Sequence, residues 1–299
     1  MSDAGPTTLC GIELQHPIIN ASGTFDAIAA RLAFGDAVID RFPFSAYVSK
    51  TITPAPRVGN PPPRLWEEPA AMVNSIGLPN KGLDGFLGSD LPVLAELPVP
   101  LIVSVMATSV EQFAPLVEAV AARDEVAGLE LNVSCPNVHS GLIVGEEPGE
   151  TSALIERLRP LTAKPLIVKL TPNVADPAAI AIAAEQAGAD AVSLINTIKA
   201  APLLADGRPW LGAGSGGLSG PAVRTIALKQ VADVAAAVEI PVVGMGGIER
   251  GSDAAALLGA GATVVAVGTA SFRDPLAAER IRGELEALRR EVAVPAGRP

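Results

Sequence analysis

The sequence predicts an α/β barrel of eight strand–helix units that form one domain over residues 1–299. Short apolar runs recur eight times along the chain, and helical patterns separate most neighbouring runs. Apolar residues make up 49% of the chain and aromatic residues only 3%, so Ala, Val, Ile and Leu must fill the core, as in a parallel sheet covered by helices. No break in composition divides the 299 residues, and one barrel takes about 250, so we favour a single barrel over two doubly wound halves.

The apolar runs are expected to form the barrel strands in chain order. A short hairpin is predicted before them, at residues 8–19, with Cys10-Gly11 and His16-Pro17 as turn signals, and it could plug the bottom of the barrel. The predicted strands are residues 18–21, 46–49, 101–105, 129–133, 166–170, 191–195, 242–245 and 264–267.

Boundary residues support the helices between these strands. Asp176 is placed to cap a helix that starts with Pro177 and stops at Gly188. Pro221 is expected to open a second helix, and Ser252-Asp253 to cap a third.

Charge and the start of the chain restrict the partners and the compartment. The net charge is −10, from 32 acidic and 22 basic residues, which argues against nucleic acid or an anionic membrane as a partner. A bound phosphate would therefore depend mainly on backbone N–H groups. Residues 1–6 have neither the basic nor the apolar region of a secretory signal, so we expect a cytoplasmic protein.

A mean hydropathy of +0.38 raises the possibility of a membrane span. The most apolar long stretch, 177–198, contains Glu185, Gln186 and Asp190, so it is better interpreted as a helix, a Gly turn and a buried strand. The two cysteines, Cys10 and Cys135, provide neither a disulfide framework nor the ligands of an iron–sulfur cluster. We expect no bound metal, and we interpret Cys10 as structural.

Polar or glycine residues end most of the predicted strands. In an α/β barrel the carboxyl ends of the strands form one lip that carries the active site, so these residues should converge there. Each alone is a weak indication, because Gly and Thr often serve only in turns or helix caps. The set comprises Ser22, Lys50, Thr51, Ser104, Asn132, Lys169, Asn196, Thr197, Gly246, Gly247, Gly268 and Thr269.

Glycine-rich segments follow the last two predicted strands, at 244–248 and 267–270. Barrels often bind a phosphate at this place under exposed backbone N–H groups, which suggests a mononucleotide such as FMN. The segment 212–217 fits the dinucleotide pattern G-x-G-x-x-G, but it follows a loop rather than a strand. We therefore reject it as a dinucleotide site.

Alternation within the strands predicts which side chains face the barrel interior. Glu130 and Asn132 share one face of their strand, opposite leucine and valine, and Lys169 shares the inner face of the next with Ile167. Burying an unpaired lysine would cost several kcal/mol. Lys169 is therefore either paired with Glu130 or faces a cofactor that gains negative charge; we favour the second, and both can hold.

The strongest candidate for chemistry is the thiol of Cys135. A lone cysteine is usually a buried structural residue. Here Asn132 and Asn137 flank it with amides that an apolar site has no reason to bury, so we interpret Cys135 as a nucleophile or base at the lip. Residues 137–149 exceed the usual βα loop of about 2–6 residues, which indicates a surface excursion or a lid that places Cys135 and excludes water.

These motifs extend over nearly the whole chain, and others accompany them at 21–23, 49–51, 56–61, 74–80, 168–173, 195–197 and 216–221. Together they resemble those of class 1 dihydroorotate dehydrogenases. A cysteine base resembles class 1 rather than the membrane-associated class 2, which uses serine. The Pro-Arg-x-Gly-Asn-Pro run at 56–61 most resembles the class 1B catalytic subunit. Ser104 departs from that pattern, because class 1B usually has an asparagine there.

The resemblance implies FMN-dependent oxidation of (S)-dihydroorotate to orotate in pyrimidine (UMP) synthesis, with Cys135 as the general base. FMN would contact Ser22, Lys50, Thr51, Asn132, Lys169, Ile195, Gly220, Gly246, Gly247, Gly268 and Thr269. The substrate would contact Lys50, Asn74, Ser75, Ile76, Gly77, Leu78, Asn132, Asn137, Asn196 and Thr197.

The route of the electrons depends on the class. Class 1B resemblance implies a catalytic homodimer with a separate FAD and iron–sulfur subunit that reduces NAD⁺, whereas class 1A enzymes use fumarate. Two other functions stay open: a related FMN-dependent oxidoreductase acting on another pyrimidine ring, and a non-enzymatic barrel that binds a phosphate or effector. The latter leaves Cys135, Lys50 and Lys169 without a role.

Overall fold

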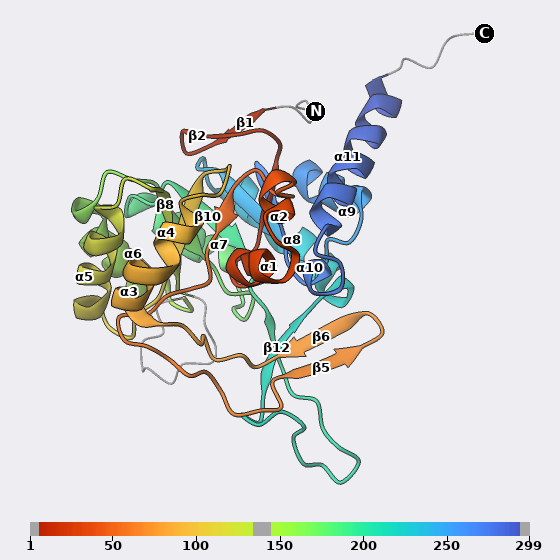
Figure 1. Cartoon of the computed structure of the whole chain (residues 1–299), viewed down its shortest axis with the longest axis horizontal. Helices are drawn as coiled ribbons and strands as arrows, with labels where there is room; N and C mark the ends of the chain where they lie inside the picture. The colour runs from red at the N-terminus through yellow and green to blue at the C-terminus, as the bar shows by residue number, and fades with distance from the viewer. Residues whose placement is uncertain (1–5, 134–144, 294–299) are drawn as a thin grey trace.

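The structure is a computed structural model that describes residues 6–133 and 145–293. Eight parallel strands form one sheet in the order β3-β14-β13-β10-β9-β8-β7-β4, and helices surround it (Figure 1). All eight predicted strands are present, so the (β/α)8 prediction is confirmed. They are β3 (Ile18–Asn20), β4 (Tyr47–Val48), β7 (Leu101–Val105), β8 (Val126–Asn132), β9 (Leu166–Lys169), β10 (Ala191–Leu194), β13 (Val242–Met245) and β14 (Val264–Val267).

Helices follow the barrel strands and cover the outer face of the sheet. The longer ones are α1 (Ala27–Phe34), α5 (Val110–Ala121), α6 (Pro148–Leu158), α7 (Pro177–Gln186), α8 (Arg224–Ala237), α9 (Gly251–Gly259) and α11 (Ala277–Ala293). Short elements are α2 (Ala37–Asp40), α3 (Gly82–Gly85), α4 (Leu91–Leu94), α10 (Ala270–Arg273), the π-helix η1 (Phe86–Asp90), and the 3-10 helices η2 (Arg159–Leu161) and η3 (Pro221–Val223).

Two apolar clusters flank the barrel wall. Leu129 and Leu131 of β8 belong to the outer cluster, between sheet and helices, whereas Ile167 of β9 belongs to the inner one. Glu130 and Lys169 lie within 4 Å of one another, so both face the interior as the alternation predicts. The inner cluster consists mainly of small and branched side chains, which fill a barrel with few aromatic residues.

A side chain completes the barrel between its first two strands. The amide of Asn20 in β3 donates from Nδ2 to the Val48 carbonyl oxygen at 2.7 Å and accepts from the Val48 N–H through Oδ1 at 2.8 Å. Asn20 is fully buried. The amide thus takes the place of a peptide group in the hydrogen-bond ladder, and it fixes the loops that follow β3 and β4.

The predicted hairpin is present and closes one end of the barrel. Strands β1 (Thr7–Leu9) and β2 (Ile12–Leu14) pair antiparallel, and Cys10 and Gly11 at their turn have φ of 52° and 81°. Leu9, Ile12 and Leu14 are buried in the inner cluster with side chains of the barrel strands. The hairpin therefore plugs the end opposite to the strand tips (Figure 1).

A second sheet, which we did not predict, stands over the other end. It has four strands in the order β11-β12-β6-β5, all antiparallel. They are β5 (Leu65–Glu68), β6 (Ala71–Asn74), β11 (Ile198–Ala200) and β12 (Gly216–Ser219). The loops after β4 and β10 supply these strands, so long βα loops extend over the lip as expected (Figure 1).

The predicted helix boundaries are confirmed except at α9. The Asp176 carboxylate accepts from the N–H groups of residues 178 and 179, and Gly188 follows the helix with φ of 98°. Pro221 opens η3, which leads directly into α8. Ser252-Asp253 is not the cap of α9, because that helix begins at Gly251 and Asp253 lies inside its first turn, where its carboxylate accepts from the N–H of residue 250. In the described part of the chain, no helix has both the length and the apolar character needed to cross a membrane.

Candidate active site

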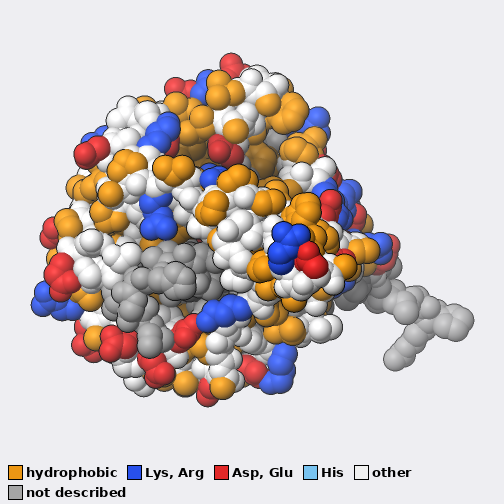
Figure 2. Space-filling view, turned by 90° about the horizontal axis from the view of Figure 1, so that it is seen from below, with side chains coloured by type: hydrophobic (Ala, Val, Ile, Leu, Met, Phe, Trp, Pro, Cys, Tyr) orange, Lys and Arg blue, Asp and Glu red, His pale blue; other side chains and the backbone are white. Residues whose placement is uncertain are grey.

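A cavity of about 540 Å³ opens where the barrel strands end, under the four-stranded sheet. That volume is in the usual range for small-molecule sites, about 300–1,000 Å³. Figure 2 views the molecule from the side of β5 and β6 and shows hydrophobic side chains gathered on this face, with lysine or arginine side chains among them. Phe34, Leu65 and Phe272, from α1, β5 and α10, form an apolar rim and are 61%, 49% and 52% exposed.

Backbone amides converge on the cavity after β13 and β14. Gly246 and Gly247 follow β13, Gly268 and Thr269 follow β14, and all four line the cavity. Within the described residues, the N–H groups of Gly247, Gly268 and Thr269 donate no hydrogen bond. Unpaired amides that face one space form an anion-binding concavity, so this end of the cavity suits a phosphate.

The glycines of this concavity are required by the space around them. A Cβ at Gly246 would lie 2.6 Å from Cβ of Ala227, and a Cβ at Gly247 would lie 2.7 Å from Cβ of Arg224. Their φ angles of 130° and 74° also exclude most side chains. Asp253 also fixes the loop that follows β13. Its carboxylate pairs with Arg224 and accepts from the backbone N–H groups of residues 249 and 250.

Cations and amides line the other part of the cavity. Lys50 is exposed at the wall and makes no ion pair with any described residue. Lys169 also reaches the wall, with its side chain 6% exposed, and its Nζ lies 3.7 Å from Glu130 Oε1. The predicted pairing with Glu130 is therefore confirmed, and Lys169 also lines the cavity. Asn74, Asn132 and Asn196 complete this part with donors and acceptors suited to a planar polar ring.

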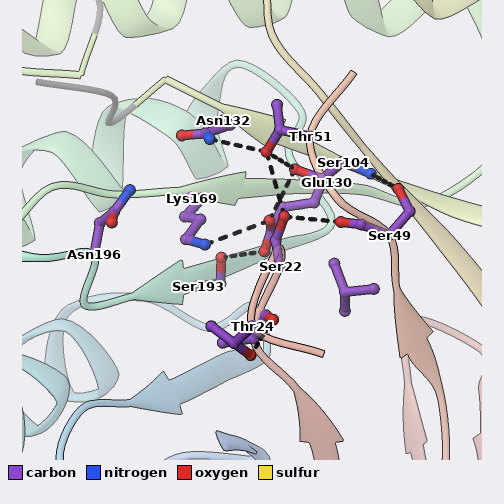
Figure 3. A network of polar contacts seen from close by, with 12 residues as sticks. Ser22, Thr24, Ser49, Thr51, Ser104, Glu130, Asn132, Lys169, Ser193 and Asn196 are labelled. Atoms are coloured by element: carbon purple, nitrogen blue, oxygen red, sulfur yellow. Dashed lines mark hydrogen bonds and ion pairs between the residues drawn. The ribbon is translucent and has the colours of Figure 1, made fainter. Parts of the chain in front are cut away.

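Hydroxyl groups connect the wall to the barrel interior (Figure 3). Asn132 Nδ2 donates to Thr51 Oγ1 at 3.1 Å, and Thr51 Oγ1 lies 2.9 Å from Ser104 Oγ. Ser104 Oγ in turn donates to Glu130 Oε1 at 3.2 Å. Ser22 donates to a backbone carbonyl at 2.8 Å and lies 3.3 Å from Thr51 Oγ1. Four barrel strands or their ends, those of β3, β4, β7 and β8, are thus joined behind the wall.

The Pro-Arg-x-Gly-Asn-Pro run at 56–61 supports the segment 74–80. Arg57 and Asn80 exchange backbone hydrogen bonds at 2.9 and 3.0 Å, and the N–H of Asn60 donates to the residue 76 carbonyl. Gly77 has φ of 76° and Leu78 has φ of 54°, an uncommon value for leucine. A Cβ at Gly77 would lie 2.5 Å from the Asn60 backbone nitrogen. The run therefore holds a tight turn against the cavity.

Two further predicted motifs support Thr197. Asn173 donates from Nδ2 to the Thr197 carbonyl oxygen at 3.0 Å. A Cβ at Gly217 would lie only 1.8 Å from Thr197 Oγ1, so glycine is needed for Thr197 to fit. Gly217 belongs to β12, so the segment 212–217 leads into a strand instead of following one. Its rejection as a dinucleotide site agrees with this geometry.

Most of the predicted site residues line the cavity. Two predicted residues do not: Ser75 is buried and its Oγ accepts from Asn60, and Ser104 lies inside β7, fully buried, rather than at a strand end. Cys135 and Asn137 lie outside the described residues, as does most of the segment 137–149, whose end belongs to α6. The residues that do line it are Ser22, Lys50, Thr51, Asn74, Ile76, Gly77, Leu78, Asn132, Lys169, Ile195, Asn196, Thr197, Gly220, Gly246, Gly247, Gly268 and Thr269.

Sequence reasoning missed some of the wall. Ser219 of β12 and the apolar rim were not predicted, because neither ends a barrel strand. Ser219 accepts from Thr269 Oγ1 at 2.9 Å and so couples the extra sheet to the anion-binding end. Cys10 lies at the hairpin turn, where its thiol donates to the Asp190 carbonyl oxygen, and burial raises its pKa to about 12. That thiol stays protonated, as a structural cysteine would.

Together the fold and the cavity define a (β/α)8 barrel with a small-molecule cavity at the strand tips, the place where barrel enzymes carry their active sites. The family model of dihydroorotate dehydrogenase matches residues 6–288. The chain belongs to the dihydroorotate dehydrogenase family.

Named relatives support this assignment. The catalytic subunit of dihydroorotate dehydrogenase B (NAD(+)) from Geobacter metallireducens is 44% identical over 283 residues, which cover 93% of this chain and 90% of the relative. A Solibacter usitatus protein, provisionally named dihydroorotate dehydrogenase A (fumarate), is 43% identical with 93% and 91% coverage. A crystal structure of dihydroorotate dehydrogenase from Eimeria tenella, in complex with ferulenol, covers 96% of this chain and 85% of that one, with a TM-score of 0.79 and 23% identity. At that identity the likeness shows the fold.

Proposed function

We propose that the protein oxidises (S)-dihydroorotate to orotate, with FMN as its cofactor, in pyrimidine (UMP) biosynthesis. The observation that carries the proposal is the division of one cavity into an anion-binding end, made of backbone amides, and a part with two lysines and three asparagines. Dihydroorotate dehydrogenases are flavoproteins as a family, and this cavity fits one phosphate at one end and a planar, carboxylate-bearing ring in the other part.

The cofactor would be held along the strand tips. Backbone amides of Gly246, Gly247, Gly268 and Thr269 suit the phosphate, where a side chain at the glycines would clash. Ser22, Thr51, Asn132, Lys169, Ile195 and Gly220 line the remaining path and would contact the flavin. The flavin, when bound, supplies a hydride acceptor.

The substrate would lie beside Lys50, whose ammonium group suits the carboxylate of dihydroorotate. Asn74, Asn132, Asn196 and Thr197 present amides and a hydroxyl that suit the ring N–H and C=O groups. Ile76, Gly77 and Leu78 form the turn beside them, while Ser75 would act from behind it through Asn60. Asn137 would complete the set from the segment after β8.

Cys135 would take the proton from C5 of dihydroorotate while the hydride leaves C6. A free thiol has a pKa near 8.5, so only a few per cent is thiolate at neutral pH. The rate of this half-reaction should therefore rise as the solution becomes alkaline. Cys135 follows β8 by a few residues, and β8 presents Asn132 at the cavity wall, which supports a place for Cys135 near the substrate.

The oxidant is the finer part of the proposal. We expect a cytoplasmic homodimer that passes electrons to a separate FAD and iron–sulfur subunit and then to NAD⁺. The "catalytic subunit" name of the Geobacter relative implies another subunit in that enzyme. A relative of similar identity carries a fumarate-type name, so overall identity does not choose between the two oxidants.

The test is anaerobic bleaching of the bound flavin. The purified protein should be yellow, release FMN on denaturation, and lose its flavin absorbance when dihydroorotate is added under nitrogen. Turnover should be fast with artificial acceptors, slow with fumarate or NAD⁺, and restored with NAD⁺ by the partner subunit. A colourless protein that regains no activity with FMN would refute the proposal in favour of a phosphate or effector-binding barrel. A flavin that only another dihydropyrimidine bleaches would redirect it to a related oxidoreductase.

A further inference from the structure

Glu130 is a buried carboxylate that the proposed function does not use. It is 3% exposed and is not part of the cavity wall. Its Oε1 accepts from Ser104 Oγ at 3.2 Å and its Oε2 accepts from Ser193 Oγ at 3.1 Å. Lys169 Nζ is farther away, 3.7 Å from Oε1. Both oxygens are thus bonded to serine hydroxyls (Figure 3). The Lys169 ammonium forms an ion pair with Glu130, but at 3.7 Å it lies beyond hydrogen-bonding distance.

This arrangement leaves the charge of Lys169 available to the cavity. A carboxylate with bare oxygens would draw the ammonium group into a close, charge-assisted contact of about 2.8 Å. Two hydroxyl donors instead spread the negative charge of Glu130 and fix the carboxylate in place. Since Lys169 lines the cavity and Glu130 does not, the distance between them sets how much positive charge a bound molecule meets.

The same carboxylate sets the direction of the hydroxyl chain to the wall. Because Glu130 accepts from Ser104, Ser104 must accept from Thr51, whose own proton is then used. Thr51 Oγ1 therefore accepts from Asn132, and Nδ2 is the atom of that amide that faces Thr51. Through these hydrogen bonds Glu130, which does not line the cavity, orients the Asn132 amide at the cavity wall.

We propose that Glu130 is a positioning residue for the redox site: held by Ser104 and Ser193, it sets the charge that Lys169 presents to the bound flavin and the orientation of the Asn132 amide. The proposal rests on the proposed flavin site. It predicts opposite effects for two changes. Removing the charge of Glu130 makes the cavity more positive, and removing a serine that holds Glu130 lets the carboxylate approach Lys169 and makes the cavity less positive.

The experiment measures the midpoint potential of the bound flavin by anaerobic dye equilibration in the purified, flavin-loaded protein. E130Q should raise the potential, because the electron-rich reduced flavin meets a less compensated cation. The expected change is about tenfold in the ratio of reduced to oxidised flavin, which is about 30 mV for a two-electron couple. S193A should lower the potential in the same assay.

Ser45→Ala is the matched control. Ser45 is also a buried serine of the barrel, 2% exposed, but its hydroxyl donates to the carbonyl oxygens of residues 16 and 18 at the opposite end. It should leave the potential unchanged although it removes a buried hydroxyl. Unchanged potentials in both E130Q and S193A, or shifts of the same sign, would overturn the proposal while the wild-type flavin and its bleaching keep the proposed function intact. If E130Q fails to fold, the sign of the S193A shift decides.

Discussion

Replacing Asn20 by alanine should open the seam between β3 and β4. The change removes a donor at 2.7 Å and an acceptor at 2.8 Å, and it leaves the buried N–H and C=O of Val48 without those partners. A buried polar group that loses its partner costs about 1–3 kcal/mol, so two of them cost about 2–6 kcal/mol, and we expect a loss of about 3–5 kcal/mol. Asn20→Asp should also destabilise at neutral pH, because a carboxylate cannot donate to the Val48 carbonyl.

Urea denaturation followed by circular dichroism would measure this loss as a difference in the free energy of unfolding. Ser152→Ala is a suitable control, since its hydroxyl donates to Glu156 on an exposed helix face, where the change should stay within about 0.5 kcal/mol. A loss below about 1 kcal/mol in Asn20→Ala would refute the view that this amide closes the barrel. The Asp variant should recover part of its deficit at acidic pH, when the carboxyl group can donate.

Four further changes test the site and its surroundings. Cys135→Ala should bind FMN and orotate but slow flavin reduction by dihydroorotate about 10²–10⁴-fold in anaerobic stopped flow, whereas Cys135→Ser should keep some activity with a more alkaline optimum; near-normal rates in the alanine variant would exclude Cys135 as the base. Lys169→Ala should lower the flavin midpoint potential, and an unchanged potential in a folded variant would make Lys169 purely structural. Gly247→Ala should weaken FMN retention in equilibrium dialysis, because its Cβ would clash with Arg224, while Gly207→Ala, also at positive φ but with nothing within 4 Å, should not; equal retention would contradict the cradle. Burial lowers the pKa of His16 to about 4, against about 6.5 in an unfolded chain, so the unfolded state alone gains a proton as the pH falls from about 6.5 to 4 and stability should fall by on the order of 2–3 kcal/mol. Urea titrations should show that His16→Asn lacks this loss, and a parallel decline in both proteins would assign it to other groups.

Local patterns predicted the barrel because each strand and cap is encoded within a few residues. The run at 166–170 and the Asp176-Pro177 helix start need no distant partner to be recognised. The extra sheet was missed for the opposite reason. Strand β5 is mostly exposed and therefore lacks an apolar pattern. Strand β6 pairs with β12, about 140 residues away, so only the tertiary structure brings these strands together.

The site was predicted to the extent that its residues end barrel strands. Alternation placed Glu130 and Lys169 on the inner face, but it could not distinguish a strand end from a strand interior. Ser104 was therefore assigned to the lip, although it lies one layer deeper. Ser252-Asp253 looked like a cap because capping residues are common throughout the first turn of a helix, and sequence alone does not tell which one precedes the helix.

The hairpin β1–β2 closes the barrel at the end opposite to the strand tips. Leu9, Ile12 and Leu14 fill its base, and the cavity opens at the strand tips, so diffusing molecules reach the cavity from the strand tips. Dihydroorotate, orotate and any small oxidant that must contact the flavin then use the same cavity entrance and bind one after another. Orotate must then leave before the oxidant can bind. Double-reciprocal plots of rate against dihydroorotate concentration, at several oxidant concentrations, would therefore give parallel lines. A protein oxidant would not compete for this entrance if it docked at the cavity rim and received electrons from the flavin through the cavity wall.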